Sequence, residues 1–295
     1  MTTTIHAPTW NAARLNGMNV EFLDQGQGPL VVCLHGFPDQ PGTWTPLMGK
    51  LAAHGFRAVA PCLRGYTQAA KAPDGNYREW AVASDALELI SVLGYDCAAI
   101  VGHDWGAAAA YVAAALAPER IKRLVTLAVP YGPAFGRAMM FDGDQQRRSW
   151  YWFFLQLPFA EAAIANEDFE FVSRLWREWS PGFELPAPQM RALKERLAVP
   201  GVLTEILAYY RQALGAPATP PAEVAAKLAQ PISVPTLYLH GRNDGCIGAD
   251  LGEGMARFFS GHFRRRVMEG VGHFLHTEEP HLVGDEILTF LRIHA

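Results

Sequence analysis

The segment spanning residues 99–110, "AIVGHDWGAAAA", constrains the fold of this chain more than any other. An apolar run ends at Gly102, Asp104 follows two residues later, and an alanine-rich helical pattern begins at Gly106. Glycine is favoured on both sides of so sharp a turn, because a Cβ atom there would collide with the adjoining strand or helix. The segment therefore predicts a buried strand, a strained turn that lifts the Asp104 side chain clear of the backbone, and a helix.

Short β-rich runs alternate with helical patterns through the first 130 residues of the chain. The runs at 29–36 and 97–102 are almost entirely apolar, and the run at 121–130 is mostly apolar after its Lys122 and Arg123, as expected for strands that are buried on both faces. In the segment 77–94, apolar residues recur at spacings of three and four, which predicts an amphipathic helix. This alternation indicates an α/β fold, in which helices cover a mostly parallel sheet.

The alternation breaks from about residue 131 to residue 231, where the chain is helical, aromatic and rich in proline. It resumes at 234–241, "VPTLYLHG", with a further strand. The simplest account is a continuous α/β core with a helical insert between its sixth and seventh strands. We therefore predict a first part of the core at 1–132, a helical cap at 133–231 and a second part of the core at 232–295.

Composition and charge limit the class of partner. The formal net charge of −4 gives no sign of a nucleic-acid or anionic-membrane partner. The first ten residues lack the basic residues and apolar run of a signal peptide, and no apolar stretch approaches the roughly 20 residues of a membrane span. We expect a cytoplasmic protein without nucleic-acid or membrane partners. Four cysteines without metal or redox spacing are expected to be reduced thiols: Cys33, Cys62, Cys97 and Cys246.

An aspartate at the strand-to-helix turn has chemical consequences. The turn has the pattern of a nucleophile elbow, and the positive end of the helix dipole favours an ionised Asp104. A carboxylate that attacks saturated carbon forms an ester, which activated water can hydrolyse, whereas a serine would form a stable ether. Asp104 therefore indicates displacement at an epoxide or a carbon–halogen bond rather than esterase chemistry. The alternative is that Asp104 only caps the helix.

Turnover of such an ester needs a base for water and an acid that orients the base. His273 lies in the loop after the last predicted strand, and Asp244 lies just beyond the seventh strand. The chain order Asp104, Asp244, His273 matches the order of nucleophile, acid and histidine in α/β hydrolases. A core or capping role for His273 and a simple turn at Asp244 are the alternatives. We interpret His276, near the start of the final helix, as structural.

The loop "LHGFPDQPGTW" after the third strand offers a second set of groups. The backbone N–H groups of Phe37 and Trp105 are candidates for an oxyanion hole during hydrolysis of the ester. His35 is expected to hold this loop in place, and Pro38 is a candidate for a cis peptide bond.

With these residues identified, the sequence resembles the epoxide hydrolase branch of the α/β-hydrolase superfamily. The matching segments are "HGFP", "LRGY", "GHDWGA", "GRND" and "GVGHF", and the similarity covers nearly the whole chain after the first twenty residues. The resemblance implies an α/β-hydrolase fold with an eight-stranded, mostly parallel sheet and a helical cap after the sixth strand. It also implies an epoxide as substrate and water as co-substrate, and it implies neither a cofactor nor a metal. Apolar residues of the cap suggest that the substrate is a small hydrophobic molecule, with Trp152, Phe153, Phe154 and Leu155 as candidate lining residues.

In that branch two cap tyrosines bind and protonate the epoxide oxygen. The resemblance places the first at Tyr151 in "RSWYWFFLQLP" and the second at Tyr210 in "LAYYRQAL", with Tyr209 as the competitor. One departure is "PCLRGY", which lacks the acidic residue usual two positions before Arg64 and leaves the local packing of that loop open. We interpret Arg64 as structural. The expected substrate-binding residues are Phe37, Pro38, Trp105, Trp152 and Tyr209.

Two other functions compete with this interpretation. Haloalkane dehalogenases share the aspartate and the following tryptophan, but Phe37 stands where their halide-binding asparagine is often found, which leaves Trp150 or Trp152 as stand-ins. Haloacid enzymes of the fluoroacetate type are expected to carry arginine at the position of Trp105. A non-catalytic ligand-binding protein would most simply have lost one of the three catalytic groups. The sequence leaves the oligomeric state open, a homodimer included.

Overall fold

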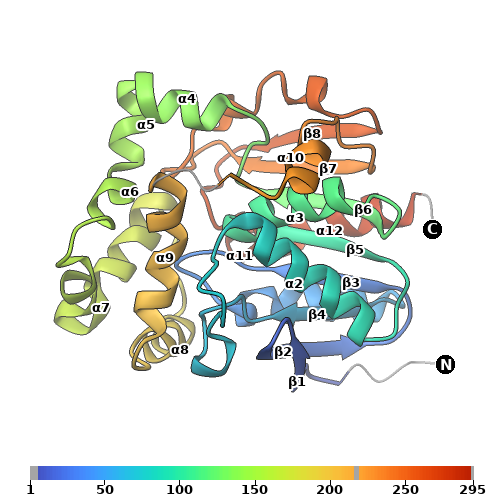
Figure 1. Ribbon diagram of the computed structural model, residues 1–295, viewed down its shortest axis with the longest axis horizontal. Coiled ribbons are helices and arrows are strands. Elements are labelled where there is room, and N and C mark those ends of the chain that lie inside the picture. The colour runs from blue at the N-terminus through green and yellow to red at the C-terminus, as the bar shows by residue number, and fades with distance from the viewer. Residues whose placement is uncertain (1–5, 216–218, 294–295) are drawn as a thin grey trace.

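The computed structural model describes residues 6–215 and 219–293, which contain one sheet of eight strands in the order β1-β2-β4-β3-β5-β6-β7-β8 (Figure 1). β2 pairs antiparallel with both β1 and β4, and all other neighbours are parallel. The predicted α/β-hydrolase sheet is therefore confirmed. The strands are β1 (Thr9–Leu15), β2 (Met18–Gly26), β3 (Leu30–Leu34), β4 (Arg57–Pro61), β5 (Ala98–His103), β6 (Ile121–Leu127), β7 (Thr236–Gly241) and β8 (Phe263–Met268).

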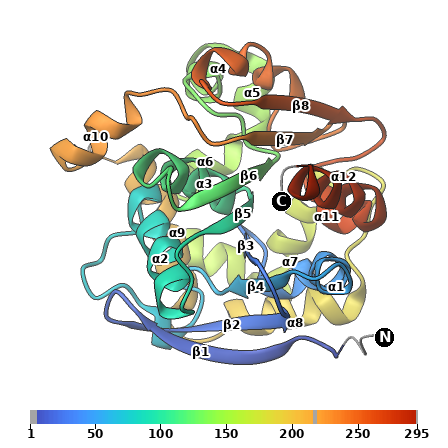
Figure 2. The ribbon, with the colours of Figure 1, turned by 90° about the vertical axis from the view of Figure 1, so that its right-hand side faces the viewer.

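Helices cover both faces of this sheet (Figure 2). On one face lie α1 (Thr45–Ala53), α11 (Leu275–Glu278) and α12 (Pro280–Arg292), and on the other lie α2 (Glu79–Val92) and α3 (Trp105–Leu116). Alternate strand residues therefore enter two different cores. Along β3, Val31 packs on the α1 and α12 side, whereas Val32 packs on the α2 and α3 side.

The register of the sheet brings distant loops together. Leu34 of β3 pairs with Gly102 of β5, and Leu127 of β6 pairs with both His103 of β5 and Leu239 of β7. Because parallel strands end at the same edge, the loops after β3, β5 and β7 lie side by side there. This edge is where the predicted site residues of those loops are found.

The segment between β6 and β7 is helical, as predicted. Figure 1 shows α4 to α9 beside the sheet, whereas α10 packs back on α3. α7 is interrupted at Asn166, Glu167, Asp168 and Phe169, the last three with left-handed backbone. The assignment of residues 133–231 to a separate cap domain remains a prediction. The helices are α4 (Ala134–Phe141), α5 (Gly143–Arg148), α6 (Trp150–Phe154), α7 (Ala160–Trp179), α8 (Ala187–Leu197), α9 (Val202–Leu214) and α10 (Ala222–Leu228).

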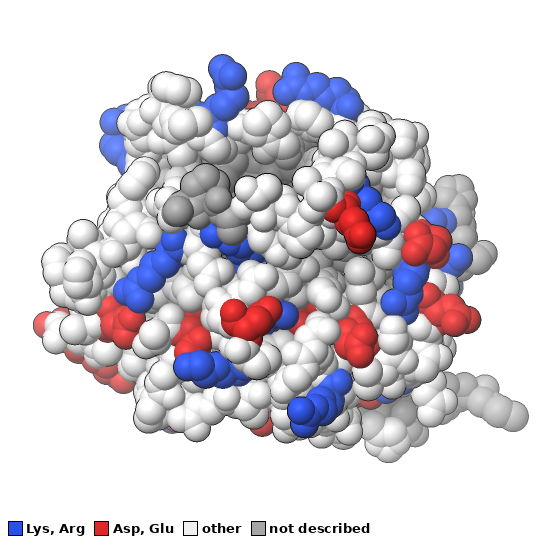
Figure 3. All heavy atoms as spheres, in the orientation of Figure 1, with Lys and Arg blue, Asp and Glu red and all other residues white. Residues whose placement is uncertain are grey.

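The surface carries both signs of charge. On the face seen in Figure 3, lysine and arginine side chains are interspersed with aspartate and glutamate. Within residues 6–215 and 219–293, no helix is both long enough and apolar enough to cross a membrane. The thiols of Cys33, Cys62, Cys97 and Cys246 are free, as predicted.

Candidate active site

Asp104 occupies the predicted sharp turn between β5 and α3. Its backbone has φ 50° and ψ −121°, a strained conformation for a residue with a side chain. The flanking glycines are required sterically. A Cβ on Gly102 would lie 2.3 Å from the carbonyl oxygen of Gly106, and a Cβ on Gly106 would lie 2.2 Å from that of Leu34. The turn is therefore pressed against β3, and its side chain is directed toward the loop after that strand.

We expect Gly106→Ala to destabilise the fold by about 3 kcal/mol, because backbone rather than a flexible side chain must move to admit the methyl group. Gly136, inside α4, is a matched control, since nothing lies within 4 Å of a Cβ added there. Gly136→Ala should be neutral or stabilise by about 0.5–1 kcal/mol. Urea denaturation measures both, and equal effects of the two substitutions would contradict this account of the turn.

The Asp104 carboxylate is held by the loop after β3. The N–H of Phe37 donates to its Oδ1 at 2.8 Å, and the Phe37–Pro38 peptide bond that follows is cis. Gly36 permits this approach, because a Cβ there would lie 2.3 Å from the same oxygen. Burial raises the pKa of the Asp104 carboxyl, whereas His273 and the N–H groups of Phe37 and Trp105 act to lower it. Both predicted oxyanion donors thus face this carboxyl group.

The predicted histidine and acid meet Asp104 at the sheet edge. His273 Nδ1 lies 2.8 Å from Asp244 Oδ2, and His273 Nε2 lies 3.8 Å from Asp104 Oδ2. Nε2 is buried and has no hydrogen-bond partner among the described residues. One imidazole nitrogen, Nδ1, is therefore fixed by Asp244, and the other, Nε2, is directed toward the region beside Asp104.

Asp244 is built to stay ionised. Its Oδ1 accepts hydrogen bonds from the N–H groups of Cys246 at 2.7 Å and Ile247 at 2.8 Å. Burial acts to raise the pKa of its carboxyl, but His273 and a hydrogen bond from His240 lower it far below its ordinary value. His240, on β7, lies 3.0 Å from Asp244 Oδ2. Sequence analysis missed His240, for which the only local signal is its spacing of four residues before Asp244.

Two further buried histidines, His103 and His276, lie near His273. His103 Nε2 lies 3.0 Å from the carbonyl oxygen of His273. His276 Nε2 lies 3.5 Å from Asp39 Oδ2, and its ring stacks on Trp44 with centroids 4.3 Å apart. Contrary to expectation, His276 does not lie at the start of the final helix but on the separate short helix α11. The final helix, α12, begins later, at Pro280. This packing agrees with a structural role for His276.

Among the residues that the structure describes, two groups of buried side chains have the donor types of a metal site. The atoms of Asp39, His103 and His276 lie within 4.8 Å of one another, as do those of Asp244, Cys246 and His273. In the second group the Asp244 oxygens already accept backbone N–H and imidazole hydrogen bonds. These hydrogen bonds account for the second grouping.

The predicted tyrosines converge from α6 and α9. The Tyr151 and Tyr210 rings are buried and perpendicular, with centroids 5.7 Å apart. The Tyr210 ring also lies 5.4 Å from Phe37 and 5.1 Å from Trp105. Both phenols therefore lie beside the Asp104 turn, and burial keeps the pKa of each well above the ordinary value.

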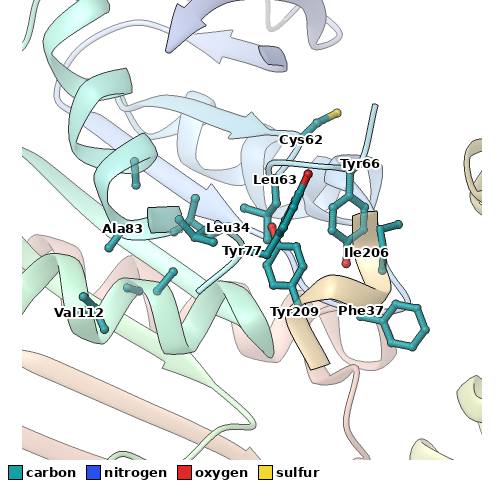
Figure 4. Packing of buried hydrophobic residues seen from close by; sticks show 14 of the residues in the cluster. Leu34, Phe37, Cys62, Leu63, Tyr66, Tyr77, Ala83, Val112, Ile206 and Tyr209 are labelled. Carbon is teal, nitrogen blue, oxygen red and sulfur yellow. The ribbon is translucent and has the colours of Figure 1, made fainter. Parts of the chain in front are cut away.

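The Tyr209 ring contacts Trp105, but its hydroxyl is directed away from this group. Its hydroxyl donates to the carbonyl oxygen of Arg64 at 2.9 Å, and its ring packs with Tyr66 and Tyr77 (Figure 4). Of the two adjacent tyrosines, the geometry favours Tyr210 as the site residue. The buried Arg64 guanidinium pairs with Asp85 of α2 at 2.7 Å, so in this loop, which lacks the acidic residue usual two positions before Arg64, the partner of Arg64 comes from a helix.

The remaining predicted substrate contacts form an aromatic wall. Trp105 is half-buried and packs on Trp152 at 5.4 Å and on Tyr209 at 5.4 Å between centroids. Pro38 offers its carbonyl oxygen to Trp176 Nε1 at 2.8 Å, which ties its loop to α7. The site is thus enclosed by apolar rings, and Asp104 itself is 7% exposed.

Comparison with known proteins identifies the family of this chain. The family pattern described as "alpha/beta hydrolase fold" matches residues 29–280. Epoxide hydrolase 4 of Homo sapiens is 26% identical over 94% of this chain and 76% of its own length. Epoxide hydrolase A of Mycobacterium tuberculosis is 28% identical over 97% of this chain and 98% of its own length.

The solved structures include an epoxide hydrolase from Vigna radiata, with TM-score 0.81 and 26% identity over 97% of this chain and 98% of its own. An epoxide hydrolase from an endophytic Streptomyces also has TM-score 0.81 and 26% identity, over 97% and 95% of the two chains. The family match spans most of the chain, and the sheet order and strand-to-helix turn fit it. This chain is a hydrolase that belongs to the α/β-hydrolase fold family and has epoxide hydrolases among its relatives.

Proposed function

We propose that this protein hydrolyses small hydrophobic epoxides to vicinal diols through a covalent ester on Asp104. The observation that carries the proposal is the meeting of three groups at one sheet edge. A carboxylate at a strained turn lies 3.8 Å from an acid-oriented histidine, and two buried phenols lie beside it. This set supplies a nucleophile, a base for water and acids for the departing oxygen.

The first step is alkylation of Asp104. A carboxylate oxygen bonds to the less hindered epoxide carbon as the bond from that carbon to the ring oxygen breaks. Tyr151 and Tyr210 bind the ring oxygen, which takes a proton from a phenol. An alkoxide is far more basic than a phenolate, so a phenol can usefully share its proton as the ring opens.

The second step is hydrolysis of the ester. His273 takes a proton from water, whose oxygen adds to the ester carbonyl carbon of Asp104. The resulting oxyanion accepts hydrogen bonds from the Phe37 and Trp105 N–H groups, and the diol leaves with the original carboxylate oxygen. Alkylation removes the negative charge of Asp104, one of the groups that raises the pKa of His273. Ester formation should thereby lower the pKa of His273, which favours the neutral imidazole that hydrolysis needs.

The state of the cap tryptophans favours an epoxide over a halide. Trp152 Nε1 already donates to the Tyr151 oxygen at 2.8 Å, so it is not available as a halide donor in this arrangement. Trp150 packs against Phe171 and Arg174 instead. Halide departure needs weak N–H donors and no proton, whereas two converging phenols suit an oxygen leaving group.

The rate of the hydrolysis step should depend on the protonation state of His273. Burial acts to lower the pKa of His273, but Asp244 and Asp104 outweigh it, so the pKa of His273 is raised above its ordinary value in the free protein. Hydrolysis needs neutral imidazole, so its rate should fall as pH drops through the pKa of His273. In the alkyl-enzyme that pKa should be lower than in the free protein. Single-turnover rates between about pH 5 and 8, compared with an NMR titration of His273, check this. Hydrolysis that accelerates as pH falls would contradict it.

A panel of epoxides and haloalkanes, assayed side by side for diol and for halide, tests the proposed function. We expect diol from hydrophobic epoxides and little halide from haloalkanes of similar size. Halide release without diol would favour the dehalogenase alternative. Binding without either product would favour a non-catalytic ligand-binding protein. A reaction without added cofactor or metal, and a cytoplasmic location, remain parts of this proposal.

A further inference from the structure

The two phenols of the proposed site differ in their surroundings. The Tyr151 oxygen accepts a hydrogen bond from Trp152 Nε1 at 2.8 Å and lies 3.2 Å from Cys246 Sγ. The Tyr210 oxygen is buried without a hydrogen-bond partner among the described residues. The Trp105 side chain acts to lower the pKa of Tyr210, but no well-aligned hydrogen bond reaches the Tyr210 oxygen.

The donors at Tyr151 have defined chemistry. An indole N–H can only donate, so Trp152 contacts the oxygen as a donor whether Tyr151 is phenol or phenolate. Cys246 can donate or accept, and burial holds the pKa of its thiol well above the ordinary value. The sulfur therefore keeps its proton at neutral pH. When Tyr151 gives its only proton to an epoxide oxygen, the contact with Cys246 becomes S–H···O.

The direction of this contact decides what Tyr151 can do. In the resting site burial raises the pKa of Tyr151, and the neighbouring Cys246 raises it further. Once Tyr151 has lost its proton and the S–H group donates, both neighbours stabilise negative charge on the Tyr151 oxygen. Tyr210 has no equivalent pair of donors.

Further hydrogen bonds position Cys246 against Tyr151. The N–H of Cys246 donates to Asp244, and its carbonyl oxygen accepts from Gln145 Nε2 at 2.9 Å. Gln145 lies on α5, directly before the helix that carries Tyr151, and also donates to Ser149 Oγ at 2.8 Å. The loop that positions the Asp244 carboxylate thus also places a thiol against Tyr151.

We propose that Trp152 and Cys246 are positioning residues that stabilise the Tyr151 phenolate, so that Tyr151 transfers the proton during ring opening and Tyr210 only donates a hydrogen bond. This inference rests on the proposed epoxide hydrolysis. As the bond from Asp104 to carbon forms and the bond from carbon to ring oxygen breaks, the Tyr151 proton moves to that oxygen. During hydrolysis one proton of water ends on the second diol oxygen, and the other restores Tyr151.

The test is a single-turnover measurement with styrene oxide, or whichever epoxide of the panel alkylates the protein fastest. Trp152→Phe should slow alkylation about 10-fold to 100-fold, the range for a hydrogen bond to a charged group. Hydrolysis of the alkyl-enzyme should change less than about twofold, because water attacks the ester with His273 as base and Tyr151 recovers its proton only afterwards. Trp150→Phe is the matched control on the same helix and should leave both rates within about twofold.

Double substitutions separate this role from a structural one. In a Tyr151→Phe background, Trp152→Phe should have less than about a twofold further effect, whereas in a Tyr210→Phe background its full effect should remain. Cys246→Ala should slow alkylation about threefold, and Cys246→Ser, which keeps a donor, should restore it.

An equal effect of Trp152→Phe in both tyrosine backgrounds would overturn the inference. Cys246→Ser as slow as Cys246→Ala would overturn the part assigned to the thiol. A variant that fails to fold would lose both alkylation and hydrolysis. A folded variant in which both steps are slowed would overturn the inference. Absence of any alkyl-enzyme in the unaltered protein is a different result, since it would overturn the proposed function itself.

Discussion

Replacement of Asp104 by asparagine should abolish epoxide turnover, with a loss of about 10⁴-fold or more, the scale seen when a catalytic nucleophile is removed. The amide keeps the shape of the carboxyl group and its contact with the Phe37 N–H. It cannot displace the oxygen of an epoxide, since it has no negative charge to form the ester. Steady-state diol formation and intact mass after exposure to a reactive epoxide measure the two effects.

Asp104→Ala serves as a check on Asp104→Asn, because alanine cannot revert to aspartate by deamidation. Both variants should keep the overall fold, which circular dichroism would show. Asp244 and His273 remain in place in both, so any residual activity would report catalysis without the nucleophile. Diol formation at the unaltered rate in either variant would exclude covalent catalysis by Asp104.

Replacement of His273 by glutamine should trap the alkyl-enzyme. Alkylation depends on Asp104 and the phenols, whereas hydrolysis needs the imidazole to take a proton from water. We expect turnover to fall by about 10³-fold or more while one substrate mass is added to the protein. Intact mass spectrometry after incubation with the epoxide gives the direct measurement.

His276→Gln is the matched control for trapping of the alkyl-enzyme in His273→Gln. His276→Gln changes a nearby histidine whose ring stacks on Trp44 rather than facing Asp104. That variant should turn over without accumulation of an adduct, although loss of a buried contact is expected to reduce its stability. An adduct in His276→Gln and none in His273→Gln would reverse the assignment of the base.

The sequence was most informative where chemistry and backbone depend on neighbouring residues. The turn at Asp104 follows from the glycines beside it, and their close approach to β3 was predictable because both strands are apolar and parallel. The helical segment after the sixth strand was also predictable, because the alternation of strands and helices breaks there. The interruption of α7 at residues 166–169 had no such signal, because none of these residues is glycine or proline.

Contacts between distant segments were harder to predict. Tyr209 and Tyr210 differ by about 100° around one helix, so their choice depends on how α9 packs, not on their spacing. Cys246 meets Tyr151 only because the α5–α6 segment docks on the loop after β7 through Gln145. Likewise, the partner of Arg64 comes from Asp85, 21 residues away.

The most direct test of the covalent mechanism is one turnover of an epoxide in ¹⁸O-labelled water with protein in excess. The ester route predicts that the label enters the Asp104 carboxyl group, found by mass spectrometry of the peptide that contains it, while the first diol carries none. A first-turnover diol that carries the label, with an unlabelled Asp104, would show direct attack by water and contradict the account.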